Sequence, residues 1–305
     1  MLNLNVNNET SKLKAVVLGT ALSLGPTPKL EDCYDPKSRE HVLNNTYPIE
    51  EDLIKEMQEF FDVLKKYNVT VYRPEKIENY NQIFSRDIAF VIENKFVFAN
   101  VVEDRAKEIQ GIKHVYDQIE DQNIIHLPES CHVEGGDVML CGNYIFIGTY
   151  SADDYSKYIT ARTNSQAVDV IEKLFPNKTI IPFELLKSND DARNSALHLD
   201  CCLQPVGNNK AITCPDGFLD KNQYQWIVDL FGVDNIFEIS REEMYNMHCN
   251  IFSIDKNVVV SDRTFTRLNT WLEENNFIVE KIKYTEVSKQ GGLLRCSTLP
   301  LIREN

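Results

Sequence analysis

The sequence lacks the charge pattern and the apolar segments that nucleic-acid-binding and membrane-spanning proteins need. Its 32 Lys and Arg residues are outnumbered by 46 Asp and Glu residues, which gives a net charge of −14, and no basic cluster stands out. We therefore expect neither nucleic acid nor an anionic membrane as a partner. No apolar run approaches the roughly 20 residues that cross a bilayer, and the first residues show no basic leader or cleavage pattern.

Closely spaced cysteine pairs of the kind that bind metals or exchange disulfides are also missing. No C-x-x-C occurs, and most of the eight cysteines lie in apolar, strand-like segments, where a thiol behaves as a small hydrophobic group. We expect a reduced, cytoplasmic protein without a disulfide framework. The cysteines are Cys33, Cys131, Cys141, Cys201, Cys202, Cys214, Cys249 and Cys296.

No linker rich in Pro, Gly or Ser divides the chain, so we expect a single domain over residues 1–305. The hydrophobic fraction of 43% and the charged fraction of 26% are typical of a folded protein. A chain of this length buries a substantial core without metal or disulfide cross-links.

What the sequence does contain is one repeated design, in which a polar cluster precedes an apolar strand, a tight turn and a second apolar strand. Alternating apolar residues bounded by Gly, Asn and Asp are typical of β-hairpins. The polar heads recur with a loose period of roughly 50 residues, and amphipathic helices are expected between the hairpins, for example over 50–67 and 165–175. The sequence therefore predicts an α/β fold of repeated units whose polar heads gather at one end. The heads are Asp87, Asp137, Asp200, Asn250 and Cys296.

The segment "HLDCC" at 198–202 combines residue types found in metal and redox sites. On a strand, His198, Asp200 and Cys202 would face one side and Cys201 the other, so the two thiols would not share an ion. A disulfide between adjacent cysteines would be strained. We therefore expect no metal and no redox pair here. His198 and Asp200 remain, either as a paired imidazole and carboxylate that orient each other or bind a cation, or as a His satisfied at a sheet edge.

Three further motifs carry groups suited to catalysis. In "QGGLLRCS", Cys296 follows a Gly pair and an arginine, and a nearby cation lowers a thiol pKa as nucleophilic catalysis requires. In "HVEGGDV", Glu134 and Asp137 flank a Gly pair before a strand, and "FSRDIAF" places Asp87 at the start of another strand. Taken singly, each fits an inert buried Cys, a surface loop or a structural ion pair. Together they supply a thiol, an imidazole and several carboxylates.

The four motifs S-R-D, E-G-G-D, H-L-D and G-G-x-x-R-C, in this order over about residues 12–303, resemble those of the guanidine-modifying (pentein) superfamily. Its members include arginine deiminase, dimethylarginine dimethylaminohydrolase and the amidinotransferases. The resemblance implies a five-bladed α/β propeller with pseudo-fivefold symmetry. It also implies that Cys296 is the nucleophile, His198 the general acid and base, Glu134 the group that orients it, and Asp87 and Asp200 the ligands of a guanidinium.

The segment "ARTN" resembles the stretch of the hydrolases whose arginine binds the substrate α-carboxylate, which would give Arg162 that role. A surface ion pair is the alternative for this residue. The resemblance implies a cofactor-free cysteine hydrolase of arginine or a methylated arginine that yields a ureido product and ammonia or an alkylamine. The alternative is an amidinotransferase that uses the same thiolate, and a third is a binding protein of the same fold. The substrate stays open, because the additional helical insert of arginine deiminases is absent and Cys201 stands where those enzymes usually carry Thr.

Overall fold

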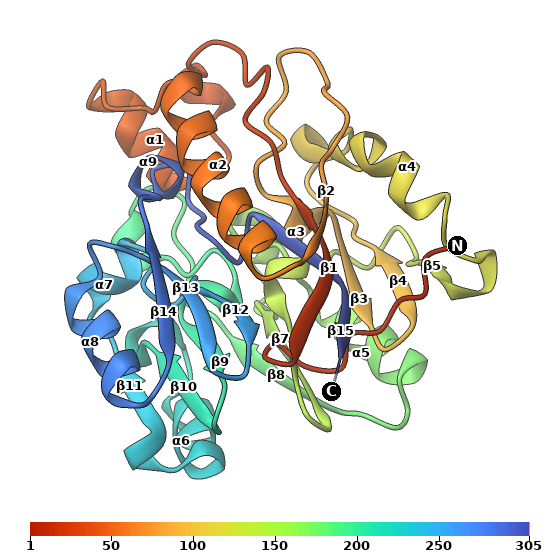
Figure 1. Cartoon of the computed structure of the whole chain (residues 1–305), viewed down its shortest axis with the longest axis vertical. Coiled ribbons are helices and arrows are strands. Elements are labelled where there is room, and N and C mark those ends of the chain that lie inside the picture. Colours follow the sequence, from red (N-terminus) through yellow and green to blue (C-terminus); the bar gives the residue numbers. More distant parts are fainter. Residues whose placement is uncertain (305) are drawn as a thin grey trace.

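The computed structural model describes residues 1–304, and its strands form five separate three-stranded sheets with the same internal order (Figure 1). In each sheet the first and second strands are antiparallel, and the third lies parallel to the second after a crossover. Parallel pairing requires such a crossover, and each one contains helical turns. The predicted α/β class and the repeated hairpin units are therefore confirmed.

The first sheet joins the two ends of the chain and the other four follow in sequence order. The first sheet consists of β15(Thr298–Glu304), β1(Lys12–Leu18) and β2(Thr70–Tyr72). The other four are β3(Ala89–Ile92), β4(Lys95–Phe98) and β5(Ile124–His126); β6(Val138–Cys141), β7(Tyr144–Thr149) and β8(Thr179–Glu184); β9(Leu203–Val206), β10(Lys210–Thr213) and β11(Ile236–Glu238); and β12(Phe252–Asp255), β13(Val258–Asp262) and β14(Ile278–Ile282).

Three of the hairpin turns contain residues with a left-handed backbone. Glu93 has φ of 56°, Gly142 has φ of 60°, and Asn208 and Asn209 have φ of 60° and 56°. Asn and Gly adopt this conformation at low cost, and it matches the twist of the flanking strands.

Helices cover the sheets, and the longest is α2(Glu50–Lys66), whose buried face includes Leu53, Met57, Phe60 and Leu64. Ser240 and Glu243 form a capping box at the start of α7(Arg241–Tyr245). No helix within residues 1–304 is long and apolar enough to cross a membrane. The remaining helices are α1(Pro36–Leu43), α3(Ser85–Ile88), α4(Lys113–Tyr116), α5(Ser165–Leu174), α6(Lys221–Phe231), α8(Thr266–Glu274) and α9(Thr285–Ser288).

The first and last strands of the chain lie side by side near the middle of the molecule (Figure 1). The segment before β1 continues this closure, since Asn5 bridges to Ile302 and Val6 bridges to Glu93. Residues from the N-terminal segment are thereby carried into the interior, and Glu9 is only 5% exposed.

One local prediction was wrong. His198, Asp200 and Cys202 do not alternate along a strand, because Leu199–Cys201 forms a single 3-10 turn and β9 begins only at Leu203. The backbone N–H of Leu199 donates to Oδ1 of Asp137 at 2.9 Å instead of to a neighbouring strand. The turn buries Cys201 and Cys202 together, and all eight cysteines of the chain are free thiols.

Candidate active site

The polar heads of different sheets meet in one buried centre. Asp87 lies on α3 directly before β3, Glu134 precedes the 3-10 turn that leads into β6, His198 and Asp200 precede β9, and Cys296 precedes β15. None of these five side chains is more than 3% exposed. Equivalent positions of the repeated unit thus supply the groups that the sequence singled out.

His198 lies between two carboxylates. Its Nε2 is 2.7 Å from Oε2 of Glu134, and its Nδ1 is 3.7 Å from Oδ1 of Asp87. Burial alone would lower the pKa of His198, but the charge of Asp87 and the hydrogen bond to Glu134 outweigh it and raise the pKa to about 9. The imidazole is therefore protonated at neutral pH in the ligand-free protein.

Cys296 is held by Asp200 and Asn250. The thiol donates to Oδ2 of Asp200 at 3.5 Å, and Nδ2 of Asn250 donates to the sulfur at 3.1 Å. Oδ1 of Asn250 accepts from the backbone N–H groups of Leu293 and Cys296, which fixes the turn that carries the thiol. Burial and the charges of Asp200 and Asp87 raise the pKa of Cys296 well above its usual value, so the resting thiol is protonated.

The expected effect of the neighbouring arginine on this thiol was wrong. The Arg295 guanidinium donates to Oδ2 of Asp200 at 2.8 Å and to both carboxylate oxygens of Glu9, and its remaining N–H groups face backbone carbonyls. These acceptors surround the cation and offset its charge, and burial together with the nearby aspartates dominates at Cys296.

Gly136 allows the centre to close. A Cβ atom at this position would lie 2.7 Å from Cγ of His198 and 2.8 Å from Oδ1 of Asp87. Such contacts are far inside van der Waals distance, so the glycine of E-G-G-D is required by the approach of the histidine and the aspartate. Asp137 supports the same region, because its Oδ2 accepts from the Thr163 hydroxyl at 2.6 Å.

Arg162 is buried and contacts the centre rather than the surface. Its Nη1 donates to both oxygens of Glu134 at 3.0 and 3.1 Å, its Nη2 donates to the carbonyl of Tyr34, and its Nε donates to that of Ile159. Every guanidinium nitrogen therefore has a protein acceptor. The role in binding an α-carboxylate stays a prediction.

Sequence reasoning missed a third arginine of the centre, Arg105, and its partner outside the motifs, Glu108. Arg105 donates from Nη1 to Oδ2 of Asp87 at 2.6 Å and binds Glu108 through Nε and Nη2 at 2.7 and 2.9 Å. Glu9 was missed in the same way. Asn250 was recognised only as a head of the repeat. No local pattern marks Arg105 and Glu108, which are buried although the residues before and between them, 103–104 and 106–107, are exposed.

A metal ion is a conceivable occupant, because donor atoms of Asp87, Glu134 and His198 all lie within 4.8 Å of one another. However, Asp87 already pairs with Arg105, and Glu134 with Arg162 and His198. A planar cation with several N–H donors fits such a set of carboxylates as well as an ion does.

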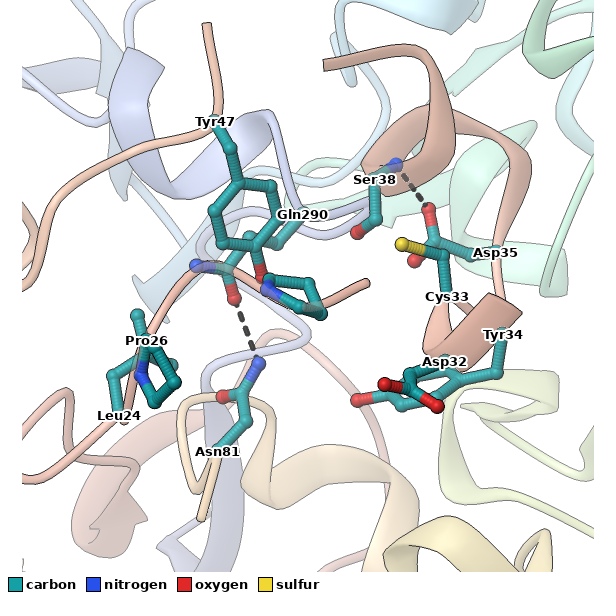
Figure 2. A pocket seen from close by; sticks show the side chains of 11 residues that line it. Leu24, Pro26, Asp32, Cys33, Tyr34, Asp35, Ser38, Tyr47, Asn81 and Gln290 are labelled. Carbon is teal, nitrogen blue, oxygen red and sulfur yellow. Dashed lines mark hydrogen bonds between the residues drawn. The ribbon is translucent and has the colours of Figure 1, made fainter. Parts of the chain in front are cut away.

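A polar cavity of about 110 Å³ lies beside this centre (Figure 2). It is linked to the centre by Tyr34, whose carbonyl binds Arg162, and by Asp35, which faces Gly291 in the turn before Cys296. In Figure 2, Nδ2 of Asn81 donates to Oε1 of Gln290 at 2.7 Å, and Asp35 caps α1 by accepting from the N–H of Ser38. The lining residues are Leu24, Pro26, Pro28, Asp32, Cys33, Tyr34, Asp35, Ser38, Tyr47, Asn81 and Gln290.

Residues 34–303 match the model of a protein family described as N,N-dimethylarginine dimethylhydrolase, eukaryotic. The chain belongs to this family. With it the chain belongs to the guanidine-modifying (pentein) superfamily that the four motifs resemble. A curated relative, the uncharacterized protein YkgA of Bacillus subtilis strain 168, is 25% identical over 244 residues, which are 79% of this chain and 77% of the relative.

Several solved structures share the fold of this chain. The N-terminal domain of ArgZ, an arginine dihydrolase from cyanobacteria, has a TM-score of 0.78 at 16% identity, with 96% of this chain and 98% of that chain covered. SxtG, an amidinotransferase from Microseira wollei, has a TM-score of 0.77 at 18% identity, with 99% and 98% covered. Proteins of this fold thus include both a hydrolase and a transferase.

Proposed function

We propose that the chain hydrolyses the guanidino group of arginine or a methylated arginine through a covalent amidino intermediate on Cys296. The observation that supports this most is the meeting of Cys296, Asp200, Asp87, His198 and Glu134 in one buried centre, each from the head of a repeated unit. The five sheets would then be the blades of a single pseudo-fivefold propeller over residues 1–305, with the centre on its axis.

Asp87 and Asp200 would hold the guanidinium. Oδ1 of Asp87 is buried and has no hydrogen-bond partner among residues 1–304, so it is free to accept from a ligand. A buried polar atom without a partner is costly, and a guanidinium N–H placed there would remove that cost. Asp200 touches the thiol, so a cation bound between the two carboxylates would bring its central carbon to Cys296.

The bound cation would also activate the thiol. In the resting centre the charges of Asp200 and Asp87 raise the pKa of Cys296, and Asp87 and Glu134 raise that of His198. A guanidinium between the aspartates offsets their charge and lowers both pKa values. The thiol then releases its proton to water on substrate binding, and the imidazolium becomes a better acid.

The chemistry follows from these protonation states. The Cys296 thiolate attacks the central carbon, and the tetrahedral adduct collapses as His198 transfers its proton to the departing amine. An amidino-thioether and neutral His198 remain. The imidazole then takes one proton from water, whose oxygen attacks the same carbon. The C–S bond breaks to return the thiolate, and the remaining hydroxyl proton passes to solvent as the neutral ureido product leaves.

An amidinotransferase is the second candidate, because the same thioether can pass its amidino group to an amine, and SxtG shares the fold. The match to a hydrolase family over residues 34–303 favours hydrolysis. The test is to incubate the protein with arginine or dimethylarginine, with and without glycine as an acceptor, and to detect products by mass spectrometry. Hydrolysis predicts a ureido product without an acceptor and no turnover by Cys296→Ser. Formation of ornithine only in the presence of the acceptor would favour the transferase, and turnover by Cys296→Ser would refute the mechanism for both.

A further inference from the structure

Two buried arginines bracket the centre with the same pattern of hydrogen bonds. Arg295 binds Glu9 through Nε at 3.2 Å and Nη2 at 3.1 Å, and its Nη1 donates to Oδ2 of Asp200 at 2.8 Å. Arg105 repeats this arrangement, with Nε and Nη2 on Glu108 and Nη1 on Oδ2 of Asp87. Each arginine therefore joins an outer glutamate to an inner aspartate in a Glu–Arg–Asp triad.

Both triads are shielded from solvent, so their charges are little screened and act strongly on each other and on a bound ligand. Glu9 and Glu108 are 5% and 3% exposed, and Arg105 and Arg295 are 4% and 0% exposed. Burial alone would raise the pKa of Glu9, but the charges of Arg295 and Arg86 outweigh it and hold the pKa near 2. Arg303 acts in the same direction, so Glu9 is the counter-charge of several buried arginines.

The outer glutamates change what the inner aspartates can bind. An isolated Arg–Asp pair has no net charge and attracts a cationic ligand weakly. With its glutamate ionised, each triad carries one negative charge, because the glutamate compensates the arginine. Glu9 is ionised at neutral pH, whereas burial, only partly offset by Arg105, raises the pKa of Glu108 to about 7, so the triad of Glu108 reaches its full charge above that pH. The arginine meanwhile fixes Oδ2 of the aspartate and leaves Oδ1 to face a ligand. In Asp87 this atom has no hydrogen-bond partner within residues 1–304 and lies 3.7 Å from Nδ1 of His198, and in Asp200 it accepts from the Cys201 thiol at 3.9 Å.

We propose that Glu9 and Glu108 are positioning residues that set the charge of the centre, so that Asp87 and Asp200 select a cationic guanidinium over its neutral ureido product. This inference rests on the proposed function for the identity of the ligand. Glu9 lies outside the matched residues 34–303, so its part comes from the N-terminal segment of this chain. Loss of either glutamate charge would weaken binding of the cation and leave binding of the neutral product nearly unchanged.

The test uses Glu9→Gln and Glu108→Gln, each in full-length protein that also carries Cys296→Ser to prevent turnover. Calorimetry at about pH 8.5, where both glutamates are ionised, then compares arginine with citrulline, which has a neutral ureido group of nearly the same shape. We expect the affinity for arginine to fall roughly tenfold or more and that for citrulline to change less than about threefold. Glu56→Gln is the matched control, because Glu56 is also buried but lies on α2, where its partners are the backbone N–H groups of Glu286 and Val287 and the ammonium of Lys283. It should leave both affinities unchanged.

Two further variants separate charge from structure. Glu9→Asp keeps the charge and should retain more arginine affinity than Glu9→Gln. The double variant Glu9→Gln/Arg295→Met removes both outer charges, leaves Asp200 charged, and should regain arginine affinity relative to Glu9→Gln alone. Equal losses for arginine and citrulline, or a double variant weaker for arginine than the single one, would overturn the inference. Thermal unfolding of each variant identifies any that fail to fold, and Glu9→Asp and Glu108→Asp then decide the question.

Failure of this inference and failure of the proposed function give different results. If the native protein binds arginine but forms no ureido product, hydrolysis is refuted while the charge effect remains measurable. If the product forms and neither glutamine variant discriminates against arginine, the charge-setting role alone is refuted.

Discussion

Nε2 of His198 lies 2.7 Å from Oε2 of Glu134, although the two residues are 64 positions apart in the sequence. The carboxylate is itself held by Arg162 at 3.0 and 3.1 Å. The ring is thereby fixed in orientation and kept protonated, which is the state that an acid facing a departing amine requires.

Replacing Glu134 with Gln should lower the pKa of His198 and change how stability depends on pH. The folded pKa of His198, about 9, lies above its unfolded value near 6.5. The contribution of protonated His198 to the free energy of unfolding is therefore fully present below pH 6.5 and is lost as pH rises through 9. It amounts to at most about 3 kcal/mol. The free energy of unfolding, measured with urea, should fall less between pH 6 and pH 9.5 for Glu134→Gln than for the native protein. Equal losses would mean that Glu134 does not hold the proton on His198.

Asn250 should matter for activity because it contacts both the sulfur and the backbone of Cys296. Asn250→Ala removes the donor to the sulfur and frees the turn, and we expect kcat to fall by roughly tenfold to a hundredfold. Asn250→Asp adds a negative charge beside the thiol, should raise its pKa further and should be worse. Steady-state kinetics from pH 6 to 10 separates the two effects. An aspartate variant as active as the native protein would contradict this role.

Gly136→Ala should reduce activity strongly, because the added methyl group would overlap His198 and Asp87. One or both must move, and a displacement of about 1 Å in a catalytic group costs roughly a hundredfold in rate. A suitable control is Gly142→Ala, since a Cβ at Gly142 meets nothing within 4 Å. That variant has only the backbone cost of its positive φ and should keep its kcat. Full activity of Gly136→Ala would show that the close packing is not needed.

Arg162 can be tested for its predicted contact with a substrate carboxylate. Arg162→Gln should raise KM for arginine more than for agmatine, which has the same guanidinium but no carboxylate. If Arg162 acts only by holding Glu134, kcat should fall by the same factor for both substrates. The ratio of kcat/KM values for the two substrates decides between the roles.

The hairpins and heads of the fold could be predicted because short-range features determine them. Asn, Gly and Asp at 142–143, 207–209 and 255–257 specify the turns, and the heads follow from their place before each strand. The orientation of the Arg295 side chain and its hydrogen-bond partners could not be predicted in this way. It depends on Glu9, Asp200 and the carbonyls of Gly136 and Val138, which only the folded chain brings together. The 3-10 turn at Leu199 likewise depends on the distant Asp137.

The most direct measurement is to quench the protein with acid during turnover of arginine labelled in the guanidino carbon, and to map the label by mass spectrometry. A covalent mechanism predicts one amidino group on the peptide that contains Cys296, and none in Cys296→Ser. Cys201→Ser should still form the adduct, because this change leaves Cys296 and the Asn250 amide that donates to its sulfur in place. Release of labelled ureido product with no adduct at any time, or an adduct on another residue, would contradict nucleophilic catalysis by Cys296.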